Sequence, residues 1–186
     1  MAAPDREVIV MVGDGSYLMM AQELVTAVQE GLKLVVVLVQ NHGFASIGAL
    51  SETVGVPGFG TSYRYRGPRG QLDGDILPVD LAANAASLGA HVLRAGTLGE
   101  LRQCLSQALV ATRTTVVHVE CDPATGSPSS QSWWDVPVAE VSSNPLTRTA
   151  RSTYEQAKAN QRTHLTPFAQ LRPLQSPDLD PETGLN

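Results

Sequence analysis

The sequence predicts an open parallel α/β sheet with helices on both faces, and three features lead to that fold class. Two apolar runs rich in β-branched residues, 7–12 and 33–39, have the composition of strands buried on both faces. Between them, residues 17–30 carry apolar side chains at helical spacing, and Gly31 follows as a helix stop. Two strands joined through a helix form a βαβ unit, which implies parallel pairing with a right-handed crossover.

The alternation of helix and strand continues to residue 120. Thr97-Leu98-Gly99-Glu100 has the form of a capping box, in which side chains satisfy the free amides at a helix start. The other expected elements are a short helix near 47–53, a helix at 79–88 ending at Gly89, a strand at 91–95, a helix from the capping box to about 111, and a strand at 115–120. The expected order is therefore β-α-β-(α)-α-β-α-β.

Composition changes after residue 122, where prolines become frequent. We expect residues 1–122 to form the α/β domain and residues 123–165 to form a loop-rich extension with a surface helix at 148–160. Residues 166–186 are proline-rich and lack periodicity, so we expect a loosely ordered tail.

Charge and hydropathy exclude some classes of partner. The net charge of −5 gives no electrostatic reason to expect nucleic acid or an anionic membrane as a partner. The longest apolar run, residues 34–39, is far shorter than the roughly twenty residues that a bilayer span requires. The first residues contain no apolar signal segment, and Cys104 and Cys121 have no metal or redox spacing. We therefore expect a cytoplasmic protein with two free thiols and with neither a nucleic-acid nor a membrane partner.

Polar turns follow both of the first two strands. Gly13-Asp14-Gly15-Ser16 follows the first strand and opens a helix, and Asn41 and Gly43 follow the second. Ligands of open α/β sheets bind at this edge, where glycines let the backbone approach a phosphate. Mg²⁺ prefers oxygen ligands, which the Asp14 carboxylate, the Asn41 amide and the Gly43 carbonyl can offer. Each turn alone also fits an ordinary helix cap or an Asn-x-Gly turn, so the pairing of the two carries the prediction.

The run from Gly13 to Phe44 resembles the motif of thiamine-diphosphate enzymes, in which Gly-Asp-Gly is followed after a helix and a strand by Asn-x-Gly. The resemblance implies thiamine diphosphate and Mg²⁺ as cofactors, with Asp14, Asn41 and Gly43 as metal ligands. Gln40 stands where many members have a second Asn, at a position that is not a metal ligand. The cofactor-binding set implied by the resemblance is Gly13, Asp14, Gly15, Ser16, Asn41, Gly43 and Phe44.

The resemblance extends beyond the motif, from residue 7 to about 162, and narrows to the inositol-catabolism branch of the family. It implies hydrolysis of a carbon–carbon bond in a cyclic polyol-derived dione, trihydroxycyclohexane-1,2-dione, to give 5-deoxyglucuronate. Two alternatives remain, an acetolactate-synthase-like or decarboxylase-like enzyme and a non-catalytic nucleotide-binding module. The stretches that carry the narrower resemblance are 41–47, 50–52, 59–64, 80–89 and 133–140.

The chain departs from the family in extent. Family members carry a glutamate on a separate pyrimidine-binding domain that activates the cofactor, and the two domain types meet across a subunit interface. This chain begins one strand before Gly13. The resemblance therefore implies an N-terminally truncated thiamine-diphosphate-binding fold, the C-terminal part of such an enzyme, with no catalytic residue of its own. We expect it to be inactive alone and to need a homo-oligomer or a partner that supplies the pyrimidine-binding domain.

Several aromatic and basic residues outside the motif have two interpretations. His42 could contact substrate or cofactor, or be an exposed turn residue, whereas His91 and His118 are expected to be packed or held by polar partners. The run 63–66 could form part of a polyol-binding lid or a solvated loop. Trp133-Trp134 suggests a packed anchor for the loop-rich segment.

Overall fold

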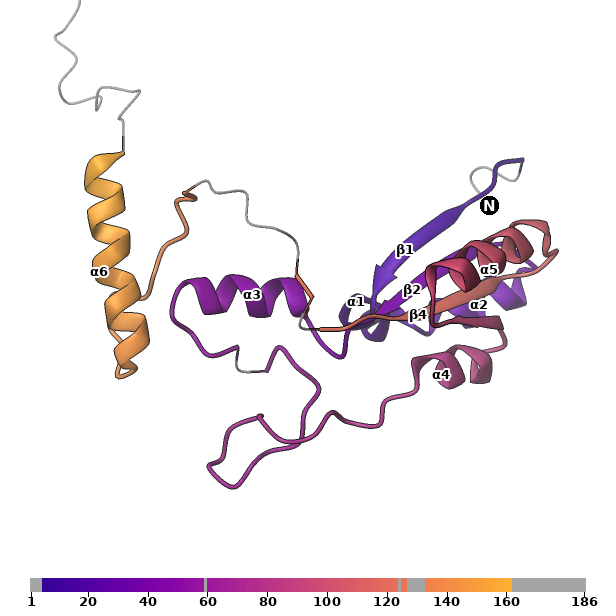
Figure 1. Ribbon diagram of the computed structural model, residues 1–186. Coiled ribbons are helices and arrows are strands. Elements are labelled where there is room, and N and C mark those ends of the chain that lie inside the picture. Colours follow the sequence, from indigo (N-terminus) through magenta and orange to yellow (C-terminus); the bar gives the residue numbers. More distant parts are fainter. Residues whose placement is uncertain (1–4, 59, 124, 127–132, 162–186) are drawn as a thin grey trace, which may run out of the picture.

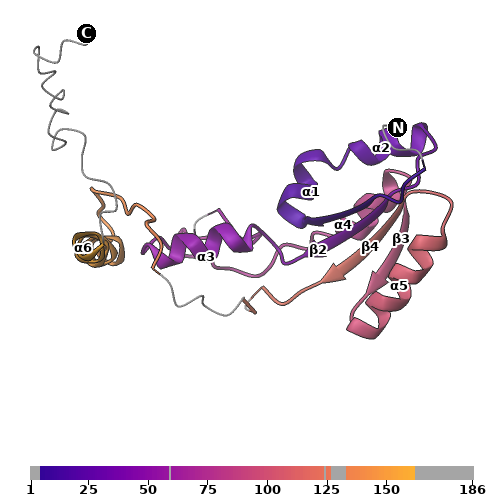
Figure 2. The ribbon, with the colours of Figure 1, turned by 90° about the horizontal axis from the view of Figure 1, so that it is seen from above.

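The computed structural model describes residues 5–58, 60–123, 125–126 and 133–161. The strands in these ranges are β1 Ile9–Gly13, β2 Val35–Gln40, β3 His91–Ala95 and β4 Thr115–Glu120. All of them belong to one parallel sheet in the order β1-β2-β4-β3 (Figure 1 and Figure 2). The predicted open parallel sheet is confirmed, with the last two strands at their predicted residues and the first two slightly further along the chain.

Helices cover both faces of the sheet, as predicted. The helices of the described residues are α1 Asp14–Met20, α2 Glu23–Gln29, α3 Ala45–Thr53, α4 Leu81–Ser87, α5 Leu98–Val110 and α6 Pro145–Asn160. Alternate residues of β2 face opposite ways, so that Val36 and Leu38 pack under α1, α2 and α4, whereas Val35 packs under α5. Figure 2 shows α5 on the opposite side of the sheet from α1 and α2. The capping box predicted at Thr97 and Glu100 is present at the start of α5.

The single helix predicted at 17–30 is wrong in one respect, because two short helices replace it. α1 ends at Met20 and α2 starts at Glu23. Ala21 and Gln22 keep right-handed dihedral angles, but the amides of Leu24 and Val25 bond to carbonyls only three residues back. The tighter turn allows Tyr17 of α1 and Leu24 of α2 to enter the same core cluster.

The prediction that the first strand is buried on both faces is also wrong. β1 lies at the edge of the sheet and pairs only with β2. Ile9 is 56% exposed and Met11 is 78% exposed, because α5 covers β3 and β4 on that face and does not extend over β1. An apolar run therefore predicted the strand correctly but not its place in the sheet.

The chain beyond β4 forms the predicted surface helix, which begins earlier than expected. Asn144 caps α6 by accepting from the Leu146 amide, and Pro145 occupies the first turn. The Thr147 hydroxyl donates to the Gly55 carbonyl at 2.8 Å and ties α6 to the turn after α3. The predicted tail at 166–186 lies outside the described residues. None of the helices among the described residues combines the length and the hydropathy that a membrane span needs.

The long segment between β2 and α4 positions the site. α3 lies beyond the carboxyl ends of the strands (Figure 1). The chain then doubles back, so that Ser62 pairs with Gly43 and Ile76 pairs with Arg64 in isolated antiparallel bridges. The turn after β2 thus lies between the sheet and residues 61–63, and backbone hydrogen bonds join it to those residues.

Candidate functional site

The two polar turns predicted to meet at the sheet edge are joined by the carboxylate of Asp14. Parallel pairing sets Gly13 beside Val39, which places the first residue of α1 next to the turn after β2. Asp14 is 1% exposed, and its Oδ2 accepts from the amides of Asn41 at 3.1 Å and Gly43 at 3.0 Å. Its Oδ1 accepts from the Gly15 amide at 2.8 Å. Asp14 therefore does more than accept an amide of its own helix, because it also fixes the backbone of the neighbouring turn.

Three potential metal ligands converge beside this carboxylate. The side-chain amide of Asn41 lies 2.9 Å from the Gly43 carbonyl oxygen and 3.2 Å from Asp14 Oδ1. With its nitrogen turned inward the amide donates to both acceptors, and with its oxygen turned inward three oxygens face one another. Adjacent oxygens of an octahedral Mg²⁺ site, each about 2.1 Å from the metal, lie about 3 Å apart. The spacing of these three groups therefore fits the ligand set of Mg²⁺.

This arrangement combines one carboxylate with an amide and a backbone carbonyl. Within the described ranges, no group of three or more His, Cys, Asp or Glu residues could hold a metal ion. The Asp14, Asn41 and Gly43 set contains a single acid, and oxygen ligands of mixed type suit Mg²⁺ rather than Zn²⁺.

Close contacts explain why two positions in these turns are occupied by glycine. A Cβ on Gly43 would lie 2.1 Å from the Thr61 carbonyl oxygen, because the Phe44 amide donates to that same carbonyl. A Cβ on Gly15 would lie 2.5 Å from the ring of Phe44. Phe44 thus packs its ring on the glycine that follows Asp14, which brings the start of α3 against the start of α1.

The predicted cofactor-binding residues surround one cavity of about 320 Å³. A Cβ on Gly13 would meet no atom within 4 Å, so the open side of this turn is not filled by the chain itself. Such open space beside backbone amides suits a phosphate group. The structure brings the whole predicted set together, since Gly13, Asp14, Gly15, Ser16, Asn41, Gly43 and Phe44 all line this cavity.

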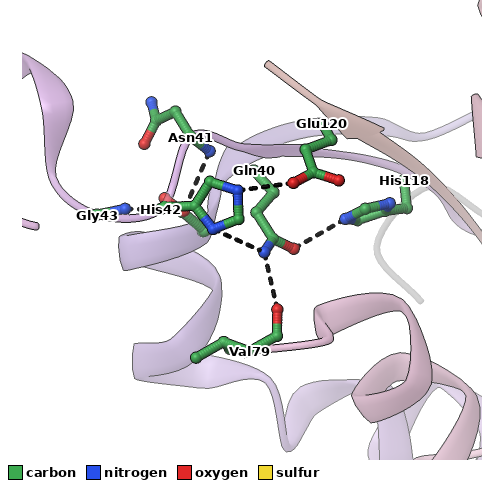
Figure 3. Close-up of polar contacts among 8 residues, drawn as sticks. Gln40, Asn41, His42, Gly43, Val79, His118 and Glu120 are labelled. Atoms are coloured by element: carbon green, nitrogen blue, oxygen red, sulfur yellow. Dashed lines mark hydrogen bonds and ion pairs between the residues drawn. The ribbon is translucent and has the colours of Figure 1, made fainter. Parts of the chain in front are cut away.

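A polar network lies on the other side of β2 (Figure 3), and His118 is the one member that was expected to be packed or held by polar partners. Gln40 and His118 are 3% and 5% exposed, and His118 Nε2 lies 2.8 Å from Gln40 Oε1. His42 Nε2 lies 2.7 Å from Glu120 Oε1. His42 therefore does not lie exposed in a turn, since 13% of its side chain is exposed and its ring faces Glu120. The sequence feature that could have indicated this network is the polar residue at the end of each of two apolar strands, Gln40 in β2 and Glu120 in β4.

The tyrosine and arginine residues of the run 63–66 make mostly local contacts. Arg64 donates to the Gly74 carbonyl at 3.0 Å, and Arg66 donates to the Gly70 carbonyl. The Tyr63 ring meets Phe44 edge-on at 6.2 Å between centroids. Burial, and then the negative charge of Asp14, raise the pKa of Tyr63. These contacts fold the segment over the turn after β2, and its role as a lid stays a prediction.

Alanine variants of Gly43 and Gly13 should differ in their effect on the free energy of unfolding, because only Gly43 is in close contact with another part of the backbone. Gly43→Ala should lower the free energy of unfolding by at least about 2 kcal/mol, because its methyl group meets the Thr61 carbonyl. Gly13→Ala should cost under about 1 kcal/mol, since its φ of −78° suits alanine and no atom lies near. Urea unfolding followed by circular dichroism measures both. Equal losses would show that the close approach at Gly43 is absent in solution.

The free energy of unfolding should decrease at acidic pH because of His118. Burial, and then the positive charge of Arg94, lower the pKa of His118 below its usual 6.5. The unfolded chain therefore binds the proton first, and stability is lost as the pH falls below about 6.5, by at most about 1.4 kcal/mol per pH unit. Urea unfolding of wild type and His118→Gln at pH values of about 7.5 and 5.5 tests this. The variant should lose less stability on acidification, and identical losses would contradict the assignment.

Comparison with known proteins agrees with this geometry. Residues 1–119 match the family described as thiamine pyrophosphate enzyme, C-terminal TPP binding domain. The chain is 40% identical over 161 residues to the 3D-(3,5/4)-trihydroxycyclohexane-1,2-dione hydrolases of Bacillus cereus (strain AH820) and Bacillus anthracis (strain A0248). The alignment covers 86% of this chain and 24% of either hydrolase. The chain thus spans about a quarter of the length of these relatives.

Solved structures show the same fold. A benzoylformate decarboxylase from Polynucleobacter necessarius superimposes with a TM-score of 0.53 at 26% identity, over 67% of this chain and 21% of that one. A thiamine diphosphate-dependent 4-hydroxybenzoylformate decarboxylase of Rhodococcus jostii RHA1 superimposes with a TM-score of 0.52 at 23% identity, over 65% and 21%. The match over residues 1–119, together with a parallel sheet carrying its polar turns at the expected edge, shows that this chain belongs to the family of C-terminal thiamine pyrophosphate-binding domains.

Proposed function

We propose that this chain forms the diphosphate- and magnesium-binding part of a thiamine-diphosphate-dependent hydrolase that opens the ring of trihydroxycyclohexane-1,2-dione. The observation that carries the proposal is the convergence of the Asp14 carboxylate, the Asn41 amide and the Gly43 carbonyl beside an open glycine-lined cavity. The substrate class rests on the 40% identity to hydrolases of that name. The expected product is 5-deoxyglucuronate, as the resemblance to the inositol-catabolism branch implies.

Each residue of the site has a distinct task in this proposal. Asp14 uses Oδ2 to fix the turn after β2 and turns Oδ1 toward the Mg²⁺ position, where Asn41 and Gly43 add two further oxygens. The turn Gly13–Ser16 offers backbone space and a hydroxyl to the diphosphate. When bound, thiamine diphosphate supplies an electron sink for the carbanion-like fragment that remains when a bond beside a carbonyl breaks.

The groups that activate the cofactor are proposed to come from outside the described residues. Among the described residues lining the cavity, Asp14 is the only acid, and both of its oxygens accept hydrogen bonds from backbone amides. A second copy of the chain or a partner with a pyrimidine-binding domain would supply an activating acid.

A cytoplasmic location is part of the same proposal, supported by two cysteines, Cys104 and Cys121, that are both free thiols.

A decarboxylase-like activity is the second candidate. It is favoured by the similarity of the fold to benzoylformate decarboxylase at 26% identity. The identity to the dione hydrolases is higher, and it extends over 86% of this chain. The hydrolase assignment therefore has the stronger support, and the two differ in substrate rather than in the cofactor site.

Asn41→Ala tests the proposed metal site. Isothermal titration of the full chain should show thiamine diphosphate binding that requires Mg²⁺, and the variant should weaken Mg²⁺ binding at least about tenfold because one ligand oxygen is lost. The melting temperature should fall only slightly, because Asp14 still accepts the amides of residues 41 and 43, and only the contacts of the Asn41 side-chain amide with Asp14 and the Gly43 carbonyl are lost.

The matched control for this variant is Asn160→Ala, which removes the same side chain from the exposed end of α6. The control should bind Mg²⁺ and thiamine diphosphate as wild type does. Unchanged Mg²⁺ binding in Asn41→Ala would overturn the ligand assignment. Binding of ADP in preference to thiamine diphosphate would favour the nucleotide-binding alternative instead.

A further inference from the structure

The turn between the two proposed metal ligands has an unusual backbone. His42 has a φ of 62° and is the only non-glycine residue with positive φ in the part of the chain that the structure describes. Residues with a Cβ rarely adopt this left-handed conformation, and they keep it only where the surroundings hold them there. His42 lies directly between Asn41 and Gly43, so whatever holds it also sets the directions of their oxygens.

Hydrogen bonds fix the His42 ring in one orientation. The Val79 carbonyl can only accept, so the amide nitrogen of Gln40 donates to it at 2.8 Å, and Gln40 Oε1 faces His118 Nε2 at 2.8 Å. The same amide nitrogen then points its second hydrogen at His42 Nδ1, 3.4 Å away. His42 Nε2 therefore carries the ring proton and donates to Glu120 Oε1 at 2.7 Å.

This chain of contacts connects β4 to the turn after β2. Gln40 and Glu120 face each other in the register of the two strands, so the network is anchored in the sheet itself. Figure 3 shows the His42 ring among Gln40 and Glu120, while the Asn41 side chain extends away from them. On its other side, the turn is tied to Asp14 Oδ2 through the amides of Asn41 and Gly43.

We propose that His42 is a positioning residue, clamped by Gln40 and Glu120, which holds the turn left-handed so that the Asn41 and Gly43 oxygens face Asp14 together. The inference rests on the proposed assignment of Asp14, Asn41 and Gly43 as metal ligands. In the proposed arrangement, the His42 side chain contacts neither the metal nor the cofactor. It acts through the backbone, and its loss lowers metal affinity by leaving the turn free to sample other conformations.

Two variants separate the clamp from the conformation that it holds. Glu120→Ala removes the anchor of the ring, and His42→Gly removes the ring while keeping a residue that tolerates positive φ. Each should raise the dissociation constant of Mg²⁺, measured calorimetrically with saturating thiamine diphosphate, about tenfold. The double variant should bind no more weakly than His42→Gly, because both changes remove the same restraint.

Glu7→Ala is the matched control. Glu7 forms an ion pair with Lys33 at 2.7 Å, as short as the contact between His42 and Glu120, and the two glutamate side chains are similarly exposed, at 54% for Glu7 and 62% for Glu120. Glu7 lies just before β1, at the end of the sheet away from the site. Its Mg²⁺ dissociation constant should stay within about twofold of wild type, since a surface ion pair contributes little.

The outcomes separate this inference from the proposed function. Wild-type affinity in Glu120→Ala and His42→Gly, with Asn41→Ala still impaired, would overturn the positioning role and leave the metal site standing. Equal binding by wild type and Asn41→Ala would refute the metal site and the inference with it. Nitrogen NMR of the metal-free chain gives an independent reading, because His42 should carry its proton on Nε2 in wild type, and a proton on Nδ1 would overturn the clamp.

Discussion

The interaction on which the site depends is the acceptance of two backbone amides, those of Asn41 and Gly43, by one oxygen of Asp14. This carboxylate is almost fully buried at the end of β1, and its partners follow β2. A buried carboxylate is stable only where its oxygens are satisfied, so the turn after β2 must stay in place for the fold as well as for binding. Structure and proposed function therefore depend on the same three residues.

The residues of the turn after β2 face two different sides of the sheet edge. Asn41 and Gly43 face the glycine-lined cavity, whereas His42 between them faces Gln40 and Glu120 on the other side of β2. The left-handed backbone at His42 makes this division possible. Gln40 makes its contacts with Val79 and His118 on the side away from Asp14, Asn41 and Gly43, the proposed metal ligands, so its side chain leaves their arrangement intact.

Local patterns predicted most of the fold, because strand composition, helical spacing and the capping box at Thr97 are properties of neighbouring residues. The residues proposed to bind the cofactor were predicted to meet because parallel strands carry their turns to one edge. The edge position of β1 and the His42 network were not predictable in the same way. Both depend on which strands lie side by side, and β2 pairs with β4, a strand far away in the sequence.

Asp14, Asn41 and Gly43 are proposed to hold a divalent cation next to the diphosphate of the cofactor. A crystal structure of the chain grown with thiamine diphosphate and Mn²⁺ in place of Mg²⁺ would test this arrangement, because the anomalous signal locates the metal. We expect one peak bonded to the Asp14 carboxylate, the Asn41 amide oxygen and the Gly43 carbonyl, each about 2.2 Å away. A peak elsewhere, or an Asn41 nitrogen still turned toward Asp14 beside bound cofactor, would contradict it.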